Sequence, residues 1–240
     1  MKKALFCFCL FIFGQTALSQ ILISLLLGDK LNTGKIEFGL DGGINFSSLG
    51  GLAGSKSLTG FHLGFYFDFK LNSDWYLHTG VIVKSPLGAT GINPYPPNNP
   101  ELDSSFVGGE VKRRLSYFNV PVMIKHVFKN HLFLEAGIQL GLLYKAYDEF
   151  YQSVKDREDL TYKLSVRKDY HPLDMGLAAG MGYRLMKGNG MNLVVRYYYG
   201  LIDIQVDDHV ANMYNRSVYF AVGIPIGAGK AKKQNDNKTN

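Results

Sequence analysis

The sequence predicts an all-β fold, an eight-stranded antiparallel up-and-down transmembrane β-barrel with short periplasmic turns and long extracellular loops. Three observations predict it. Apolar and polar residues alternate in several stretches, as in FHLGFYFDFK at 61–70. The strand glycines share a face with the charged residues, and long connections alternate with short ones. Outer-membrane barrels combine an even strand number with two unlike faces and with turns that are short on one side.

Eight stretches carry the alternation, and their length suits tilted membrane strands. About 10 residues at roughly 3.3 Å each, tilted by about 40°, cover the apolar band of about 25 Å. One face of each stretch is apolar, as at Ile44, Val122, Leu140 and Phe220, and we expect it to contact lipid. The stretches are residues 35–46, 59–70, 74–84, 113–127, 131–145, 172–185, 191–205 and 216–226.

The opposite face of these strands is expected to line the barrel interior. Isolated glycines weaken a strand, so their concentration on this face indicates that they make room in a narrow lumen. In a soluble barrel that binds an apolar ligand, the two faces would be reversed. The polar residues of the predicted inner face are Glu37, Asp41, Asn45, His62, Asp68, His78, Lys84, Tyr117, Asn119, Lys125, Glu135, Gln139, Lys145, Asp174, Arg184, Asn192, Arg196 and Tyr198.

The connections predict how the barrel is oriented. Turns 71–74, 129–130 and 187–190 are short, and outer-membrane barrels place such turns in the periplasm. An even number of strands that starts and ends on this side puts both ends of the barrel there. The long connections, which we expect outside the cell, are residues 47–58, 85–112, 146–171 and 206–215.

The N-terminus resembles a secretory signal peptide. Two lysines precede the apolar run 4–13, and the small residues ALS follow at 17–19, so we expect cleavage after Ser19. Both cysteines, Cys7 and Cys9, would leave with the signal. Residues 4–28 carry no charge, so an uncleaved anchor is the alternative.

These features predict four segments. They are a signal peptide at 1–19, an N-terminal periplasmic segment at 20–33, an outer-membrane β-barrel domain at 34–227 and a basic, polar periplasmic tail at 228–240. The formal charge is +6, but the signal and the tail hold most of the excess lysines. Since the remainder is close to neutral and has no basic stripe, we expect no nucleic-acid partner. The predicted location is the cell outer membrane.

The hairpin register pairs several residues of the inner face. Lys125 falls opposite Glu135 and Asp68 near His78, while Arg184 falls opposite Asn192 and Arg196 opposite Gly180. Buried charges are costly unless they are paired, and an eight-stranded lumen is just wide enough for side chains. We interpret these residues as an ionic network that fills the lumen. The alternative is an active or ion-binding site built from the same residues.

Candidate catalytic and metal-binding residues are few. Asp68, His78 and Ser116 supply the residue types of a nucleophilic triad, but the first two are expected inside the lumen near the periplasmic turn. No phosphate-binding loop, dinucleotide fingerprint or zinc spacing occurs in the sequence. The histidines His126, His131, His171 and His209 are scattered. We therefore predict no catalytic, metal or cofactor site and no cofactor.

The long loops are the predicted binding regions. Loop 85–112 contains the proline-rich stretch NPYPPNNPELDSSF, and loop 146–171 has dense mixed charge and several tyrosines. Binding residues concentrate on such loops. Outer-membrane lipid is the expected surrounding, and these loops or the basic tail are the expected contacts for protein partners.

Several motifs resemble the PorT-like family of outer-membrane β-barrels. They are GKIEFGLDGGINFS (34–47), LSYFNVPVMIKH (115–126), FLEAGIQLGLL (133–143) and VVRYYYGLIDI (194–204). The resemblance covers about 33–226 and implies a barrel in the outer membrane of a Gram-negative bacterium. One specific role that it implies is that of an accessory protein in type IX secretion. The last strand ends in GIPIG and a tail, whereas many outer-membrane barrels end in an aromatic residue.

The sequence therefore favours a non-enzymatic outer-membrane barrel with an accessory or partner-binding role. One alternative is an outer-membrane enzyme, of the lipid A hydrolase, acyltransferase or protease type. The soluble barrel that binds an apolar ligand is a further alternative. An aqueous channel is disfavoured, because eight strands leave no continuous path for water.

Overall fold

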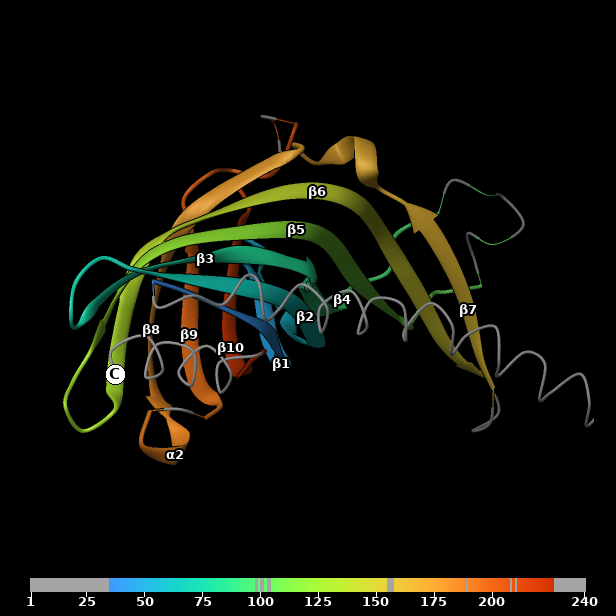
Figure 1. Ribbon diagram of the computed structural model, residues 1–240. Helices are drawn as coiled ribbons and strands as arrows, with labels where there is room; N and C mark the ends of the chain where they lie inside the picture. Colours follow the sequence, from blue (N-terminus) through green and yellow to red (C-terminus); the bar gives the residue numbers. More distant parts are fainter. Residues whose placement is uncertain are drawn as a thin grey trace, which may run out of the picture.

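Figure 1 shows the computed structural model of the chain. It describes residues 35–226, except for 98, 100, 101, 103, 104, 155–157, 189, 208 and 210. The expected signal peptide, the segment 20–33 and the tail 228–240 lie outside the described residues. Among the described residues, no helix is both long and apolar enough to cross a membrane.

The described chain consists almost entirely of strands in one sheet. The strands are β1 (Ile36–Gly50), β2 (Lys56–Lys70), β3 (Trp75–Lys84), β4 (Pro86–Ile92), β5 (Glu110–Val127), β6 (Leu132–Val154), β7 (Glu158–Ser165), β8 (Leu173–Arg184), β9 (Asn192–Gly200) and β10 (Tyr214–Pro225). A 3₁₀ turn, η1 (Arg167–Asp169), follows β7, and a single helical turn, α2 (Leu185–Gly188), follows β8.

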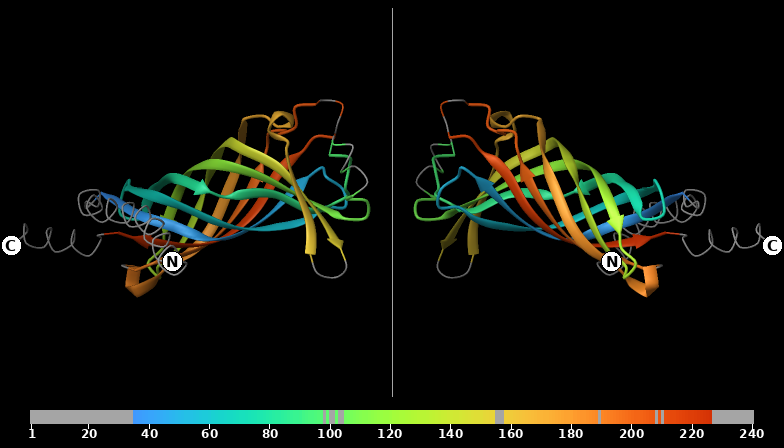
Figure 2. Two further views of the ribbon diagram at one scale, coloured as in Figure 1. Left: turned by 90° about the vertical axis from the view of Figure 1, so that its right-hand side faces the viewer. Right: turned by 90° about the vertical axis from the view of Figure 1, so that its left-hand side faces the viewer.

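The sheet closes into an antiparallel ring of eight strands, as predicted. β1 pairs with both β2 and β10, and β9, β8, β6 and β5 follow β10 in order around the ring. β3 and β4 together act as one strand of the ring, because each pairs with β2 on one side and β5 on the other. β7 pairs with β6 beyond the ring, so these two strands form an arm that projects past the barrel (Figures 1 and 2).

The apolar and polar faces of the strands point outward and inward, respectively, as the alternation predicted. Outer-face residues such as Ile44, Phe61 and Phe220 expose 46–49% of their surface. Inner-face residues such as Lys125 and Arg196 expose only 1–2%. Because the apolar rows point away from the barrel axis and the charged rows toward it, the soluble barrel with an apolar interior is excluded.

Glycines give the polar side chains their space, which confirms the interpretation of the glycine pattern. A Cβ on Gly39 would overlap the Tyr66 ring, and one on Gly223 would lie 3.2 Å from the same ring. A Cβ on Gly180 would lie 3.1 Å from Oε1 of Glu135. Large polar side chains therefore fit into this narrow lumen because their neighbours on the inner face have no side chain.

Two predicted inner-face residues, Lys84 and Lys145, are exposed on the outside instead. The register shifts at Leu63/Gly64 and again at Ser116/Tyr117, so that β3 and β6 each gain one residue at a β-bulge. An extra residue reverses the alternation beyond it. Strict alternation carried across the bulges therefore gave the wrong face for both lysines.

Parts of the predicted long connections are strands. β4 lies within 85–112, and the end of β6 with all of β7 lies within 146–171. The predicted strand 191–205 ends earlier, at Gly200. These added strands lie at the end of the barrel opposite the short turns, where pairing continues beyond the length needed to cross a bilayer.

The short turns lie together at the other end. The amide of Val127 donates to the carbonyl of Asp74, and the amide of Arg184 donates to the carbonyl of His131. Lys70 donates to Lys35 at the start of the described chain. The first and last described residues therefore lie at the short-turn end, as the even strand number predicted.

Candidate functional site

The part of the lumen nearest the short turns holds an ionic cluster centred on Asp68. Its carboxylate lies 2.6 Å from Nδ1 of His78, 2.9 Å from Nζ of Lys125 and 2.9 Å from Nη2 of Arg184. The four residues come from β2, β3, β5 and β8, so the cluster connects strands from opposite sides of the ring. The predicted pairing of Asp68 with His78 is confirmed by the register.

A second ion pair lies beside the first. Nη2 of Arg196 lies 2.7 Å from Oε1 of Glu135, and Nζ of Lys125 lies 3.8 Å from the other oxygen of that carboxylate. Lys125 faces Glu135 and Arg196 faces Gly180 in the strand register, as predicted. Gly180 leaves the room that the guanidinium needs.

The cluster extends to both neighbouring carboxylates of β1. Arg184 lies 3.6 Å from Glu37, and Arg196 lies 4.0 Å from Asp41. Arg184 faces Asn192 in the register as predicted, but its charge is directed to Asp68 and Glu37. Four carboxylates thus share three permanent cations, Lys125 and the two arginines. Each of these cations lies within 4.0 Å of two carboxylates, so the network joins strands across the lumen.

An apolar layer fills the lumen at the end next to the long connections, beyond the ionic cluster. Leu49, Leu87, Leu115 and Leu143 converge there from four strands, and each exposes at most 4% of its surface. Residues from two of the connections pack into the same layer, namely Val166, Tyr170, Ile204 and Met213. The alternation within single strands did not predict this layer. Taken together, the alternations in β4 and β5 place the apolar residues Leu87 and Leu115 on the inner face, and this pattern could have predicted the layer.

Beyond the apolar layer, β5, β6 and β7 form an ordered surface. We call these extended strands, with the described residues of the connection 93–109, the loop-side platform. Arg113 binds Asp148 with two hydrogen bonds of 2.5 and 2.8 Å, and the Tyr95 hydroxyl donates to the same carboxylate at 2.6 Å. These bonds join Tyr95 of the connection to β5 and β6 through the buried carboxylate of Asp148.

A small apolar core supports the platform. Phe106, Val111 and Phe150 are buried there together, with Tyr95 and Tyr162 packed against them. The ring centroids of Phe106 and Phe150 lie 5.4 Å apart. Phe106 is the last residue of the proline-rich stretch NPYPPNNPELDSSF in loop 85–112, one of the two predicted binding loops. Its burial anchors one end of that stretch to the barrel extension.

Charged groups on the outer face of the platform are partly paired. Glu149 accepts hydrogen bonds from Arg114 and Tyr151, and Lys163 lies 3.0 Å from its other oxygen. Partial burial raises the pKa of Glu149, but the hydrogen bonds from Lys163, Tyr151 and Arg114 outweigh it and leave the pKa below its ordinary value. Burial and the bond to Glu149 raise the pKa of Tyr151 to about 12.

The residue types of the triad do not assemble. His78 pairs with Met123 on β5, whereas Ser116 lies seven residues further along that strand. At about 3.3 Å per residue the separation along the strand is roughly 23 Å. Ser116 also lies on the outer face, opposite Lys145. Asp68 and His78 form a buried pair, and the proposed nucleophile is on the other side of the barrel wall.

The scattered histidines also remain apart. Among the described residues, no group of three or more histidine, cysteine, aspartate or glutamate side chains is arranged to hold a metal ion. His126 packs against Trp75 and Phe128 near the short turns, and His131 packs against Tyr183. Their contacts are aromatic.

Comparisons with solved structures return outer-membrane barrels. Ail of Yersinia pestis is 13% identical and covers 80% of this chain and 99% of its own, with a TM-score of 0.44. Neisserial surface protein A is 13% identical over 80% of this chain and 96% of its own, with a TM-score of 0.40. OprG of Pseudomonas aeruginosa is 13% identical over 81% and 96%, with a TM-score of 0.35. At these values the likeness carries no argument about function.

The family comparison is decisive for the class of protein. No curated protein matches the chain. The family model described as "Outer membrane protein beta-barrel domain" matches residues 15–206, which is well over half of the sequence. This match agrees with the closed ring, the outward apolar rows and the ionic interior. The chain therefore belongs to the outer membrane protein beta-barrel domain family and is a protein of the cell outer membrane.

Proposed function

We propose that this protein is a non-enzymatic, non-conducting barrel that holds the loop-side platform at the cell surface, where the platform binds a partner protein. The observation that carries the proposal is the contrast between the two ends of β5 and β6. Inside the membrane span, the lumen is filled first by the network around Asp68 and then by the apolar layer. Beyond that span, the same strands continue into an ordered surface.

A filled lumen predicts the electrical behaviour of the protein. Eight strands leave room for side chains alone, and here the lumen holds large buried side chains such as Arg196, Lys125, Tyr117 and Tyr219. In a planar lipid bilayer, the purified protein is expected to produce no steady unitary current. A reproducible, voltage-independent conductance would contradict the non-conducting part of the proposal.

The partner-binding role is tested by shortening the arm. Residues 150–162 are replaced by a two-residue turn, which removes most of the β6–β7 arm, with Phe150 and Tyr162 of the platform core, and keeps the ring. The variant is expected to insert and to keep heat-modifiable gel mobility, but to lose cross-links to the surface partner that the full-length protein forms in cells. The matched control is a change in the short turn 71–74. Equal cross-linking by the shortened and full-length proteins would contradict the role of the platform.

The specific form of the proposal is an accessory role in secretion, of the kind that the resemblance to PorT-like barrels implies. In cells that lack this chain, export by the type IX system is expected to fail, and the full-length protein is expected to restore it. The arm-shortened protein is expected not to restore it. Normal export in the deletion strain would reject the secretion role while leaving partner binding to be measured directly.

The enzymatic alternative makes a different prediction about the lumen. If the protein acted on lipid A or on peptides through Asp68 and His78, then Asp68→Ala or His78→Ala would remove an activity while the barrel still assembled. Our proposal expects these changes to reduce stability without removing any activity. Hydrolysis or acyl transfer that depends on His78 in a correctly assembled barrel would overturn it.

The proposal also includes the processing predicted from the sequence. We infer that the signal peptide is removed after Ser19 and that residues 228–240 form a periplasmic contact. Intact mass measurement of the protein from outer membranes should give a chain that starts at Gln20. A mass that includes residues 1–19 would favour the uncleaved anchor. Deletion of 228–240 tests the tail with the same export readout.

A further inference from the structure

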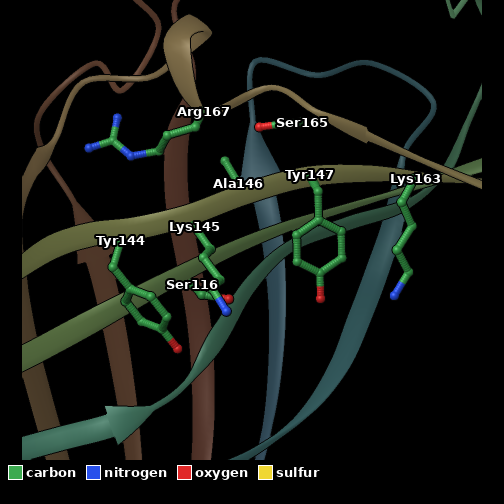
Figure 3. Close-up of a pocket in the computed structure, with 8 residues that line it drawn as sticks. All are labelled: Ser116, Tyr144, Lys145, Ala146, Tyr147, Lys163, Ser165 and Arg167. Carbon is green, nitrogen blue, oxygen red and sulfur yellow. The ribbon is translucent and has the colours of Figure 1, made fainter.

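The outer surface of the barrel has a hollow at the point where β6 leaves the membrane span. It has a volume of about 710 Å³. Figure 3 shows that Tyr144, Lys145 and Tyr147 line it from β6, with Lys163 from β7 and Arg167 from η1. The β-bulge creates this arrangement, because it leaves Tyr144 and Lys145 both exposed although they are neighbours in the sequence.

The hollow lies at the edge of the lipid-facing surface. Directly below it on the outer face are Phe118, Leu142 and Leu173, which are neighbours in the strand register and are all exposed. The Tyr144 ring stacks on the Phe118 ring at a centroid distance of 4.5 Å. Tyrosines of this kind occupy the headgroup level of a bilayer. The hollow therefore opens where the headgroups of the outer leaflet lie.

The charge in the hollow is positive. Lys163 is paired with Glu149 at 3.0 Å. Arg167 donates to the backbone carbonyls of Leu143 and Tyr170, at 3.0 and 3.1 Å, and so is held in place without being neutralised. Among the described residues, no carboxylate lies within 4.0 Å of the charged groups of Lys145 or Arg167. Two uncompensated cations thus face the headgroup region.

We propose that this hollow binds a phosphate group of a phosphorylated glycolipid in the outer leaflet. Lys145 and Arg167 supply charge-assisted hydrogen bonds to the phosphate oxygens, and the Tyr144 and Tyr147 hydroxyls are further donors. The apolar surface formed by Phe118, Leu142 and Leu173 receives the acyl chains of the same lipid molecule. Because phosphate and acyl contacts are contiguous, the site selects a lipid over free phosphate. The site does not depend on whether the platform binds a protein.

The test uses the full chain purified in detergent and native mass spectrometry to measure binding. The probes are bisphosphorylated lipid A, the same lipid without its phosphates, and inorganic phosphate. Lys145→Gln removes one charge and Lys145→Glu reverses it, and the Lys145 side chain has no ion pair whose loss would unfold the barrel. Lys129→Glu is the matched control, because Lys129 is an exposed lysine at the opposite, short-turn boundary.

We expect bisphosphorylated lipid A to bind the wild-type protein. A charge near a membrane surface contributes about 1 kcal/mol, so binding is expected to weaken roughly fivefold in Lys145→Gln and about thirtyfold in Lys145→Glu. Lys129→Glu is expected to bind as the wild type does. Arg167→Lys is expected to bind more tightly than Arg167→Gln, because it keeps the charge. Dephosphorylated lipid is expected to bind weakly and equally to all of these proteins.

Three outcomes would overturn the proposal. The first is equal binding of lipid A to the wild type and to assembled Lys145→Glu, with assembly checked by heat-modifiable mobility. The second is equal binding of phosphorylated and dephosphorylated lipid to the wild type. The third is complete displacement of lipid A by millimolar inorganic phosphate, which would identify the site as one for free phosphate rather than for a lipid.

Discussion

Asp68 and His78 face each other across the β2–β3 pair, with the carboxylate 2.6 Å from Nδ1 of the imidazole. Nε2 of the same ring lies 3.2 Å from Nη2 of Arg196. A guanidinium only donates hydrogen bonds, so Nε2 of His78 accepts this bond from Arg196. His78 therefore joins the Asp68 cluster to the Glu135–Arg196 pair.

Asp68→Asn is expected to destabilise the barrel strongly, because Lys125 and Arg184 would keep their charges and lose their nearest carboxylate. Breaking a buried pair in this way costs about 3–5 kcal/mol. Urea unfolding in lipid vesicles, followed by gel mobility, measures the loss. The control is Asp74→Asn in the exposed short turn. Equal unfolding midpoints for both variants would show that the network contributes little.

Gly137→Ala is expected to lower the yield of folded barrel. The added Cβ would overlap the Val122 carbonyl and lie 2.6 Å from Cα of Met123, both of which are backbone atoms of the neighbouring strand. Overpacking of this kind costs about 1–3 kcal/mol. Gly42→Ala is the matched control, since its Cβ would lie 3.4 Å from the Leu63 side chain in ordinary contact. Refolding into vesicles compares the two, and an unaffected Gly137→Ala barrel contradicts the crowding argument.

Ile138→Arg is expected to oppose insertion into lipid. Ile138 is exposed in the middle of the apolar row of β6 that runs from Leu132 to Tyr144. An arginine on the lipid face near the bilayer midplane costs about 2–4 kcal/mol. Val107→Arg, at an exposed position in the connection 93–109, is expected to insert normally. If the two variants fold into vesicles equally well, the outer face does not contact lipid.

The Glu149 carboxyl is expected to titrate below its ordinary pKa of 4.5, because its hydrogen bonds to Lys163, Tyr151 and Arg114 outweigh partial burial. Its folded-state pKa is lowered, so its contribution to platform stability is present above pH 4.5 and is lost as the pH falls through the folded-state pKa. A carbon-13 NMR titration of the carboxyl gives the midpoint. Lys163→Gln is expected to raise that midpoint, and a midpoint at or above 4.5 in the wild type would refute the prediction.

The sequence by itself determined which face of each strand meets lipid. The period of two in β2 and β10 separates Phe61 and Phe220 from His62 and Tyr219, and burial follows that separation. Short turns also fixed the hairpin register closely enough to pair Lys125 with Glu135. Both inferences succeed because they depend on local geometry, namely the pleat of a strand and the length of a turn.

Only the tertiary structure decided where the strands bulge, which charges meet across the lumen and how the lumen is closed. The bulge that turns Lys145 outward depends on how β5 and β6 pair, and the alternation within β6 alone gives no sign of it. The contact of Arg184 with Glu37, at 3.6 Å, joins two strands far apart in the sequence, and a hairpin register cannot reach across the lumen. The apolar layer arises in the same way, because Leu49, Leu143 and Ile204 come from distant parts of the chain and meet only when the ring closes. Period and turn length act within a few residues, whereas the filling of a lumen depends on all eight strands at once.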